Sequence, residues 1–276
     1  MRSLNAAALV FLALTGSFAH PAPPNHIVIV IEENKSYEEI IGNPAAPYIN
    51  SLAKTGMLFT RSYAVAHPSQ PNYLALFSGD THGVVDDRCP LSLPGANLAS
   101  ELSRKGLSFR MYSESMPSIG YLGCVSGNYY RKHNPAANWQ GTNVSPDMNV
   151  PLLTFHWNYS NLPTVSMVVP NQLNDMHDGE PFQAISRGDK WLQENIDPFV
   201  KWAANNSSLL ILTWDEDDDT SDNHIATIFL GPMVRQGTYD APIDHYTILR
   251  AISDMFGLRP LSKAAMKQPI EGIWKE

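Results

Sequence analysis

The chain has 276 residues, of which 43% are hydrophobic and 17% charged, as in an ordinary globular protein. This length is enough to bury a full core, so we expect one α/β domain. The net charge of −8 argues against sequence-independent binding to nucleic acid, because that binding requires clustered Lys and Arg.

The first residues have the parts of a secretory signal peptide. Arg2 precedes an apolar run at residues 6–14, and Ser17-Phe-Ala19 is a small-x-small cleavage site. A buried N-terminal helix is the alternative, and the prolines that follow disfavour it. The run is too short to span a bilayer, and no later segment is long and apolar enough to be transmembrane. We predict a signal peptide at residues 1–19, a secreted or periplasmic protein, and a mature domain at residues 20–276.

An unbroken apolar run at residues 27–31 ends in two carboxylates and a carboxamide. Such a run, without alternation, predicts a strand buried on both faces of a parallel sheet. Charge cannot continue into that core, so Glu32, Glu33 and Asn34 are expected where the strand emerges. The sequence leaves open which of the two glutamates points into a site.

A short helix capped by Ser36, a helix at residues 45–54 and a strand at residues 57–65 follow. The strand leads into the turn His67-Pro-Ser-Gln-Pro-Asn72, which continues as a helix. A hydroxyl on such a turn, near a helix N-terminus, is well placed to attack or ligate a phosphorus centre. Ser69 fits that role, and it equally fits the role of a helix N-cap.

The middle of the chain is expected to contain a helix at residues 97–104, a strand at residues 107–112, and then a long loop region. Residues 113–163 are predicted to form a loop-rich cover over the active site. The two cysteines, Cys89 and Cys124, indicate one disulfide in an exported protein, with two separate buried thiols as the alternative.

A basic cluster lies within this loop region. Arg131, Lys132 and His133 are candidates to hold a phosphate by charge-assisted hydrogen bonds, with His133 also a candidate acid for the leaving group. A solvated loop is the alternative reading of the same residues.

Two later apolar runs also end in polar segments. The run at residues 164–170 leads to Asp175 and His177, and the run at residues 209–214 leads to an acidic loop at residues 215–219. Ligands of open α/β sheets bind outside the carboxyl ends of the strands. If the three strands are neighbours, their polar side chains form a divalent metal site, whose donors suit calcium, magnesium, manganese or zinc.

The remaining elements support the same fold class. We expect a helix at residues 189–204, a strand at residues 225–230, and a helix at residues 246–256 that His245 opens. The alternation of strands and helices predicts an α/β fold. The acidic loop lacks the spacing of an EF-hand, and glycoside hydrolysis by paired carboxylates would leave the hydroxyl turn and the basic loop unused.

Several motifs together resemble the secreted acid phosphatases and phosphatidylinositol 3-phosphatases of the phosphoesterase family. That family also contains bacterial non-specific phospholipases C and lies within the alkaline-phosphatase-like superfamily. The motifs are Ile31-Glu-Glu-Asn-Lys-Ser36, His67-Pro-Ser-Gln-Pro-Asn-Tyr-Leu-Ala-Leu-Phe-Ser-Gly79, Tyr130-Arg-Lys-His-Asn-Pro135, Pro170-Asn-Gln-Leu-Asn-Asp-Met-His-Asp-Gly179 and Thr213-Trp-Asp-Glu-Asp-Asp218.

The resemblance implies a three-layer α/β sandwich, with helices on both faces of a mostly parallel sheet, and hydrolysis of phosphate monoesters, phosphoinositides among them. It implies that Ser69, activated by a metal, attacks phosphorus to form a phosphoserine that water then hydrolyses. The implied site residues fall into two groups. The metal ligands are Glu33, Asn34, Ser69, Asp175, His177, Asp215, Glu216 and His245, and the substrate contacts are Asn72, Arg131 and Lys132.

Two other functions remain open from the sequence. A phosphodiesterase of the phospholipase C type would use similar ligands. A secreted, non-catalytic calcium-binding protein would need only the acidic loop.

Overall fold

A central sheet of nine strands organises the computed structural model, which describes residues 22–155, 158–219 and 222–275. The signal peptide predicted at residues 1–19 lies outside the described residues. The strands of the sheet are β1 (Ile27–Glu32), β2 (Met57–Tyr63), β3 (Phe109–Ser113), β6 (Asn149–Pro151), β7 (Val165–Val169), β8 (Leu209–Trp214), β9 (His224–Leu230), β10 (Gly237–Tyr239) and β11 (Ile243–Asp244).

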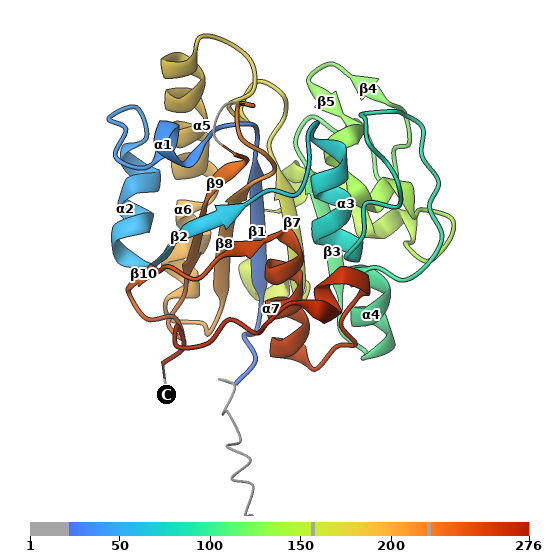
Figure 1. Cartoon of the computed structure of the whole chain (residues 1–276). Helices are drawn as coiled ribbons and strands as arrows, with labels where there is room; N and C mark the ends of the chain where they lie inside the picture. The colour runs from blue at the N-terminus through green and yellow to red at the C-terminus, as the bar shows by residue number, and fades with distance from the viewer. Residues whose placement is uncertain (1–21, 156–157, 220–221, 276) are drawn as a thin grey trace, which may run out of the picture.

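The strand order is β10-β2-β9-β8-β1-β7-β3-β6, and β11 pairs with β2. β9 pairs antiparallel with β2 and β8, whereas the other described pairings in this sheet are parallel. The prediction of a mostly parallel sheet is therefore confirmed. β1 lies between β7 and β8, so the three predicted apolar strands are neighbours and their carboxyl ends meet at the upper edge in Figure 1.

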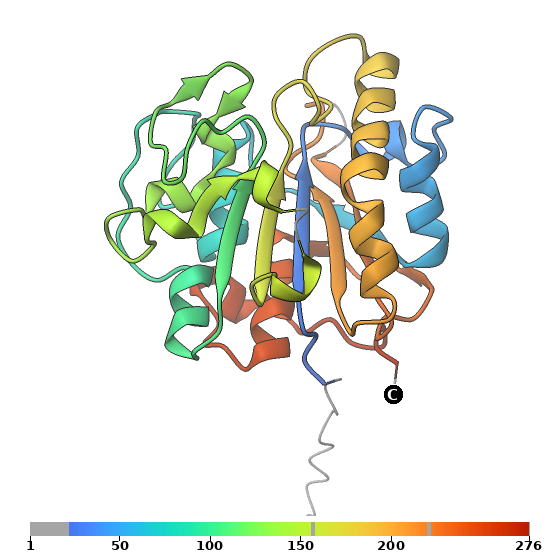
Figure 2. The same ribbon diagram turned by 180° about the vertical axis from the view of Figure 1, so that it is seen from behind.

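Helices cover both faces of the sheet, as predicted. In the view of Figure 1, α3 (Gln70–Ser78), α4 (Leu98–Arg104) and α7 (His245–Phe256) lie in front of the sheet. Behind it lie α5 (Pro181–Asn195) and α6 (Asp197–Ala203), as Figure 2 shows, and α1 (Tyr37–Ile40) and α2 (Pro47–Thr55) stand at its side. None of the helices in the described part of the chain is long and apolar enough to cross a membrane.

The first strand shows how the two hydrophobic cores form. Ile27, Ile29 and Ile31 belong to the core under α3, α4 and α7. Val28 and Val30 belong to the core under α2, α5 and α6. Successive side chains of a strand point to opposite faces, so an unbroken apolar run is what a strand between two helical layers requires.

The prediction of a single helix at residues 189–204 was wrong about where the helix begins and about its being continuous. The structure has two helices, because α5 already begins at Pro181 and ends at Asn195, and α6 begins at Asp197. Pro198 explains the break: it has no N–H to donate to an earlier carbonyl, and its ring clashes with the preceding turn of a continuous helix.

The loop-rich segment at residues 113–163 contains the edge strand β6 and, in its described part, no α-helix. A small hairpin of β4 (Val125–Ser126) and β5 (Tyr129–Tyr130) lies at the upper edge of the molecule, next to α3 (Figure 1). The short 3₁₀ helices of this segment are η1 (Arg131–His133), η2 (Pro135–Asn138), η3 (Pro146–Met148), η4 (Leu152–Thr154) and η5 (Tyr159–Asn161).

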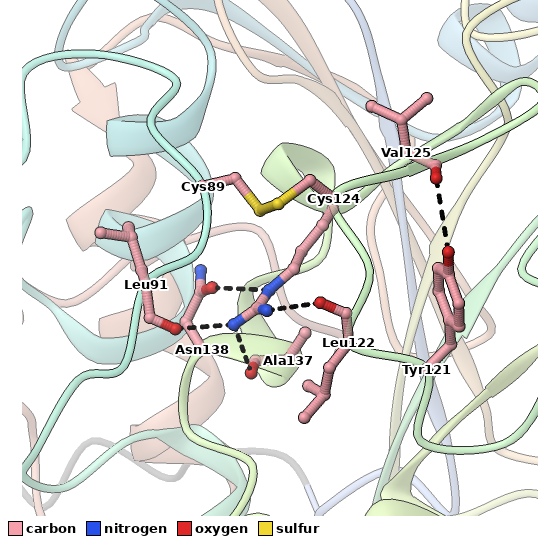
Figure 3. The surroundings of a disulfide bond; sticks show 9 residues. Cys89, Leu91, Tyr121, Leu122, Cys124, Val125, Ala137 and Asn138 are labelled. Atoms are coloured by element: carbon pink, nitrogen blue, oxygen red, sulfur yellow. Dashed lines mark hydrogen bonds between the residues drawn. A yellow bond between two sulfur atoms is a disulfide. The ribbon is translucent and has the colours of Figure 1, made fainter.

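The predicted disulfide is present. Cys89 and Cys124 are bonded, with a Cα–Cα distance of 5.8 Å, and they are 35 residues apart in the sequence. Figure 3 shows the bond, which joins the loop after α3 to the residue just before β4. It therefore ties the loop-rich segment to the rest of the domain.

We expect the double variant C89S/C124S to lose about 3 to 4 kcal/mol of unfolding free energy. The bond closes a 35-residue loop in the unfolded chain and so lowers the conformational entropy of the unfolded state, and the variant loses that effect. Urea unfolding of the oxidised wild type and of the variant measures the loss. A variant as stable as the wild type would contradict a structural role for the bond.

Candidate active site

Glu33 is the centre of a buried polar cluster at the carboxyl end of β1. Its Oε2 lies 3.1 Å from Ser69 Oγ, and its Oε1 accepts a hydrogen bond of 2.5 Å from the Tyr73 hydroxyl. His133 Nε2 lies 3.0 Å from the same Oε1. The ends of β1, α3 and η1, which are far apart in the sequence, thus converge on one carboxylate.

The direction of the strand decides between the two glutamates. Because side chains alternate along β1, Glu32 follows Val28 and Val30 toward the α5 face, whereas Glu33 lies on the side of α3. Both carboxyl oxygens of Glu32 are buried and have no hydrogen-bond partner among the described residues. Glu33 alone of the two contacts Ser69.

Ser69 precedes the first residue of α3, but it does not cap that helix. Its side chain makes no capping hydrogen bond, and its backbone is helical, with φ −48° and ψ −54°. Its hydroxyl lies instead 3.1 Å from the Glu33 carboxylate and 2.9 Å from Glu216 Oε1. Ser69 is buried, so this placement of a hydroxyl between two carboxylates is not explained by solvent or by helix capping.

The end of β8 brings Asp215 and Glu216 to the same place. Asp215 Oδ1 accepts hydrogen bonds from the backbone N–H groups of Asn34 (3.1 Å) and Glu216 (2.7 Å). Its Oδ2 has no partner among the described residues. Glu216 Oε2 lies 2.8 Å from His67 Nδ1, so one carboxylate of this strand end joins Ser69 to His67.

The loop after β7 supplies Asp175. Its backbone carbonyl accepts a hydrogen bond from the N–H of Glu33 (2.8 Å), and its Oδ1 accepts one from the N–H of His177 (2.9 Å). Its Oδ2 lies 3.8 Å from His133 Nδ1. Asp175 therefore reaches Glu33 from the opposite side to Glu216.

Burial and mutual repulsion perturb these acids. Burial raises the pKa of Glu33 to about 7, although Lys132 and the Tyr73 hydroxyl oppose the rise. Burial, and then the charge of Glu33, hold the pKa values of Asp175 and Asp215 well above the usual range. The one ammonium that opposes these shifts, that of Lys132, is thus not enough to keep several buried carboxylates ionised together.

The cluster fits a divalent metal ion. Two sets of side chains have ligand atoms within 4.8 Å of one another, namely Glu33 with His133 and Asp175, and Glu33 with Asp215 and Glu216. Buried ligand atoms without a hydrogen-bond partner in the described chain also lie here: Asn34 Oδ1, Asp175 Oδ2 and Asp215 Oδ2. Buried polar atoms are rarely left unpaired, so oxygen and imidazole donors of this kind indicate a cation site.

The two other histidines predicted as ligands lie beside the cluster. His245 Nε2 lies 2.6 Å from the backbone carbonyl of Asp215, which can only accept, so this ring is protonated at Nε2 and has its lone pair on Nδ1. His177 Nδ1 lies 2.8 Å from Asp178, and the ring is one-third exposed. Neither belongs to the two sets around Glu33.

Arg131 is placed away from the cluster. Its buried guanidinium donates hydrogen bonds to the carbonyls of Leu91 (2.6 Å), Leu122 (2.7 Å) and Ala137 (3.1 Å) and to Asn138 Oδ1 (3.3 Å). Figure 3 shows these acceptors beside the disulfide. The donors of the guanidinium bind oxygen atoms of these loops, so we do not propose Arg131 as a phosphate ligand.

Asn72 also has a structural position. Its Oδ1 accepts hydrogen bonds from the N–H groups of Val65 (2.9 Å) and Ala66 (3.1 Å), and its Nδ2 donates to the Ala66 carbonyl (2.8 Å). Asn72 therefore fixes the conformation of the loop that precedes Ser69, and its side chain has little hydrogen-bonding capacity left for a substrate.

Sequence reasoning missed two residues of the site. Tyr73 follows Ser69 by one helical turn, which is the spacing that places two side chains on the same side of a helix, but we did not use that signal. Asp87 binds the Lys132 ammonium (3.0 Å) and the N–H of Gln70 (2.9 Å), and nothing in its local sequence indicates these contacts.

In the metal-free state we expect the protein to lose stability as the pH rises. A carboxyl whose folded pKa is raised from 4.5 to about 7 favours folding below pH 4.5, and that contribution disappears as the pH passes 7. For Glu33 the change is on the order of 3 kcal/mol. Thermal unfolding in chelator between pH 4.5 and 8 measures it, with E33Q expected to flatten the profile. If the stability of E33Q depends on pH as steeply as that of the wild type, the pKa of Glu33 is not raised by burial.

We expect at least one of Ca²⁺, Mg²⁺, Mn²⁺ and Zn²⁺ to raise the melting temperature, because binding at 100 times the Kd adds about 2.7 kcal/mol. The rise should be larger at pH 7.5 than at pH 5, because protons compete for the ligands. D215N should reduce the rise, and E194Q, an exposed change on α5, should not. If none of the four ions shifts the melting temperature, the cluster is not a site for them.

The model of the Phosphoesterase family matches residues 43–259. The chain is 46% identical over 254 residues to the phosphatidylinositol-3-phosphatase of Mycobacterium tuberculosis, which covers 90% of this chain and 82% of that protein. It is 33% identical over 251 residues to the phosphate-repressible acid phosphatase of Penicillium chrysogenum, which covers 84% of this chain but only 58% of that relative.

Solved structures share the fold. A protein of the alkaline phosphatase superfamily from Vibrio parahaemolyticus superimposes with a TM-score of 0.67 at 13% identity, covering 90% of this chain and 71% of that one. A phosphonate monoester hydrolase from Silicibacter pomeroyi gives a TM-score of 0.60 at 12% identity, covering 86% of this chain and 74% of that one. The predicted alkaline-phosphatase-like α/β fold is confirmed.

Proposed function

Since this chain belongs to the phosphoesterase family, and is thus a hydrolase of phosphoric esters, we propose that it is a metal-dependent phosphomonoesterase with Ser69 as nucleophile. The observation that carries this proposal is the Ser69 hydroxyl, which lies buried between the carboxylates of Glu33 and Glu216. Serine hydroxyls need activation to attack phosphorus, and this one is surrounded by metal-binding groups.

The metal ligands that we propose are Glu33, Asn34, Asp215 and Glu216 together with Ser69, and His133 and Asp175 on the other side of Glu33. Their donor atoms are carboxylate, carboxamide and imidazole, which does not single out one divalent ion. A divalent ion bound there supplies positive charge that favours the serine alkoxide and stabilises the phosphoryl oxygens.

The side chains of the chain itself perform the remaining steps. Glu216 Oε1, at 2.9 Å, is placed to take the proton of the Ser69 hydroxyl. Ser69 Oγ then forms a bond to phosphorus as the bond to the alcohol oxygen breaks, and the leaving oxygen takes a proton from water, which gives a phosphoserine, an alcohol and hydroxide. The hydroxide attacks phosphorus, the bond to Ser69 Oγ breaks, and phosphate leaves. Glu216 returns the proton to Ser69 Oγ.

His133 suits a ligand role better than the acid role that its sequence suggested. Burial, and then the charge of Lys132, lower the pKa of His133 well below its usual range. A neutral imidazole has a lone pair for a metal but no spare proton for a leaving group. Its ring also stacks on Tyr73, with 5.3 Å between the ring centroids, which fixes its orientation.

The names of the relatives support a substrate class, and the disulfide supports a location. The two relatives described above are named phosphatidylinositol-3-phosphatase and phosphate-repressible acid phosphatase, so we propose phosphate monoesters, phosphoinositides among them. A disulfide persists in oxidising compartments, which supports export of this chain.

We expect wild-type protein with metal to release phosphate from p-nitrophenyl phosphate, and S69A to lose at least about 10³-fold in kcat, because removing a nucleophile removes the covalent route. Chelator should abolish the wild-type activity, and the metal should restore it. The matched control is S253A, which removes a buried serine hydroxyl that donates to the Leu249 carbonyl of its own helix (2.9 Å).

Other results would redirect the assignment. Full activity in S69A would exclude Ser69 as nucleophile. Release of phosphocholine from phosphatidylcholine, with no phosphate from monoesters, would indicate a phosphodiesterase. Metal binding without hydrolysis of any ester would indicate a non-catalytic binding protein.

A further inference from the structure

Lys132 carries an ammonium group at the edge of the acid cluster. The next residue in the chain, His133, lies 3.0 Å from Glu33 Oε1, so Lys132 is attached to the part of η1 that enters the cluster. Only 17% of the Lys132 side chain is exposed, which means that its position is defined by its neighbours.

Asp87 is the neighbour that sets this position. Its Oδ2 lies 3.0 Å from Lys132 Nζ, and its Oδ1 accepts a hydrogen bond of 2.9 Å from the N–H of Gln70. Gln70 directly follows Ser69 in the chain. One carboxylate therefore joins the ammonium to the backbone N–H of the residue that follows Ser69.

The segments that carry Asp87 and Lys132 are also tied in two other ways. The disulfide joins Cys89, two residues after Asp87, to Cys124. The guanidinium of Arg131, the residue before Lys132, binds the carbonyls of Leu91 and Leu122, one on each segment (Figure 3). The disulfide and these hydrogen bonds hold the backbone of the two segments in place. The ion pair therefore has to fix only the end of the Lys132 side chain.

A fixed ammonium beside the nucleophile distinguishes substrates by charge. A phosphate monoester is a dianion near neutral pH, with three non-bridging oxygens, whereas a diester is a monoanion with two. The Coulomb attraction to one positive charge grows with the charge of the substrate, and it is stronger in a partly buried site than in water. Lys132 thus favours the monoester.

We propose that Asp87 is a positioning residue that holds the Lys132 ammonium beside Ser69, and that this pair selects dianionic phosphate monoesters over diesters. The inference rests on the proposed function, because it assumes that Ser69 faces the phosphoryl group. It adds a residue, Asp87, and a basis for substrate class.

The test measures four proteins loaded with metal: wild type, K132M, D87N and the double variant. Readouts are kcat and KM for p-nitrophenyl phosphate, Ki for inorganic phosphate, and kcat/KM for bis(p-nitrophenyl) phosphate. K132M should raise Ki about 10- to 100-fold, the size of one lost charge-assisted hydrogen bond. D87N should raise Ki and KM about 10-fold, as outer partners of binding groups do, with a smaller change in kcat. Both should lower monoester activity more than diester activity.

The double variant tests whether Asp87 acts through Lys132. If it does, D87N adds little to K132M, because coupled residues are not additive. D86N is the matched control: it removes the same charge one residue away, and Asp86 pairs with the exposed Arg88. D86N should leave all three readouts unchanged. D87E, which keeps the carboxylate, should recover part of the phosphate affinity and also serves if D87N does not fold.

Melting temperatures separate positioning from stability. The inference is overturned if D87N has the same Ki for phosphate as D86N, or if D87N loses only kcat and stability. Either result leaves catalysis by Ser69 intact. Equal effects of D87N in the wild-type and K132M backgrounds also overturn it. Wild-type protein with no phosphatase activity instead overturns the proposed function itself.

Discussion

Repulsion among buried carboxylates around Glu33 is the constraint on which the rest of the site depends. Four acids from three strand ends, Glu33, Asp175, Asp215 and Glu216, lie in a space that excludes water, and burial raises the pKa of each. Such an arrangement costs stability unless a cation or protons neutralise it. A protein keeps it where function requires it, and here the buried hydroxyl of Ser69 stands among the acids.

The fold supplies the rigidity that this arrangement needs. β1, β7 and β8 are adjacent and parallel, so their carboxyl ends deliver polar side chains to one edge of the sheet (Figure 1). Two hydrophobic cores, one on each face, hold the strands in register against the repulsion at their ends. α3 begins directly after Ser69, so the turn that carries Ser69 is anchored by a helix that is buried along its whole length.

The loop-rich segment divides its basic residues between two tasks. Arg131 faces inward to backbone carbonyls near the disulfide, whereas Lys132, its neighbour, faces Asp87 at the site. A guanidinium has several donors in a planar fork and suits the binding of many carbonyls, whereas an ammonium is a compact charge that suits one anionic partner. Segments without regular secondary structure can hold a charge in place when such contacts and a covalent bond replace a helix or strand.

Local patterns determined much of this protein. The apolar runs with acidic ends predicted the strands, the proline-flanked sequence predicted the turn at Ser69, and the pair of cysteines predicted the disulfide. Each of these features depends on neighbouring residues or on a resemblance spread over the whole chain. The tertiary structure alone decided the directions of side chains. Glu32 and Glu33 differ only by the alternation of one strand, and nothing local shows which face of the sheet carries the site. The contact of Asp87 with Lys132 joins residues 45 apart in the sequence, and it forms only when the folded chain brings their loops together.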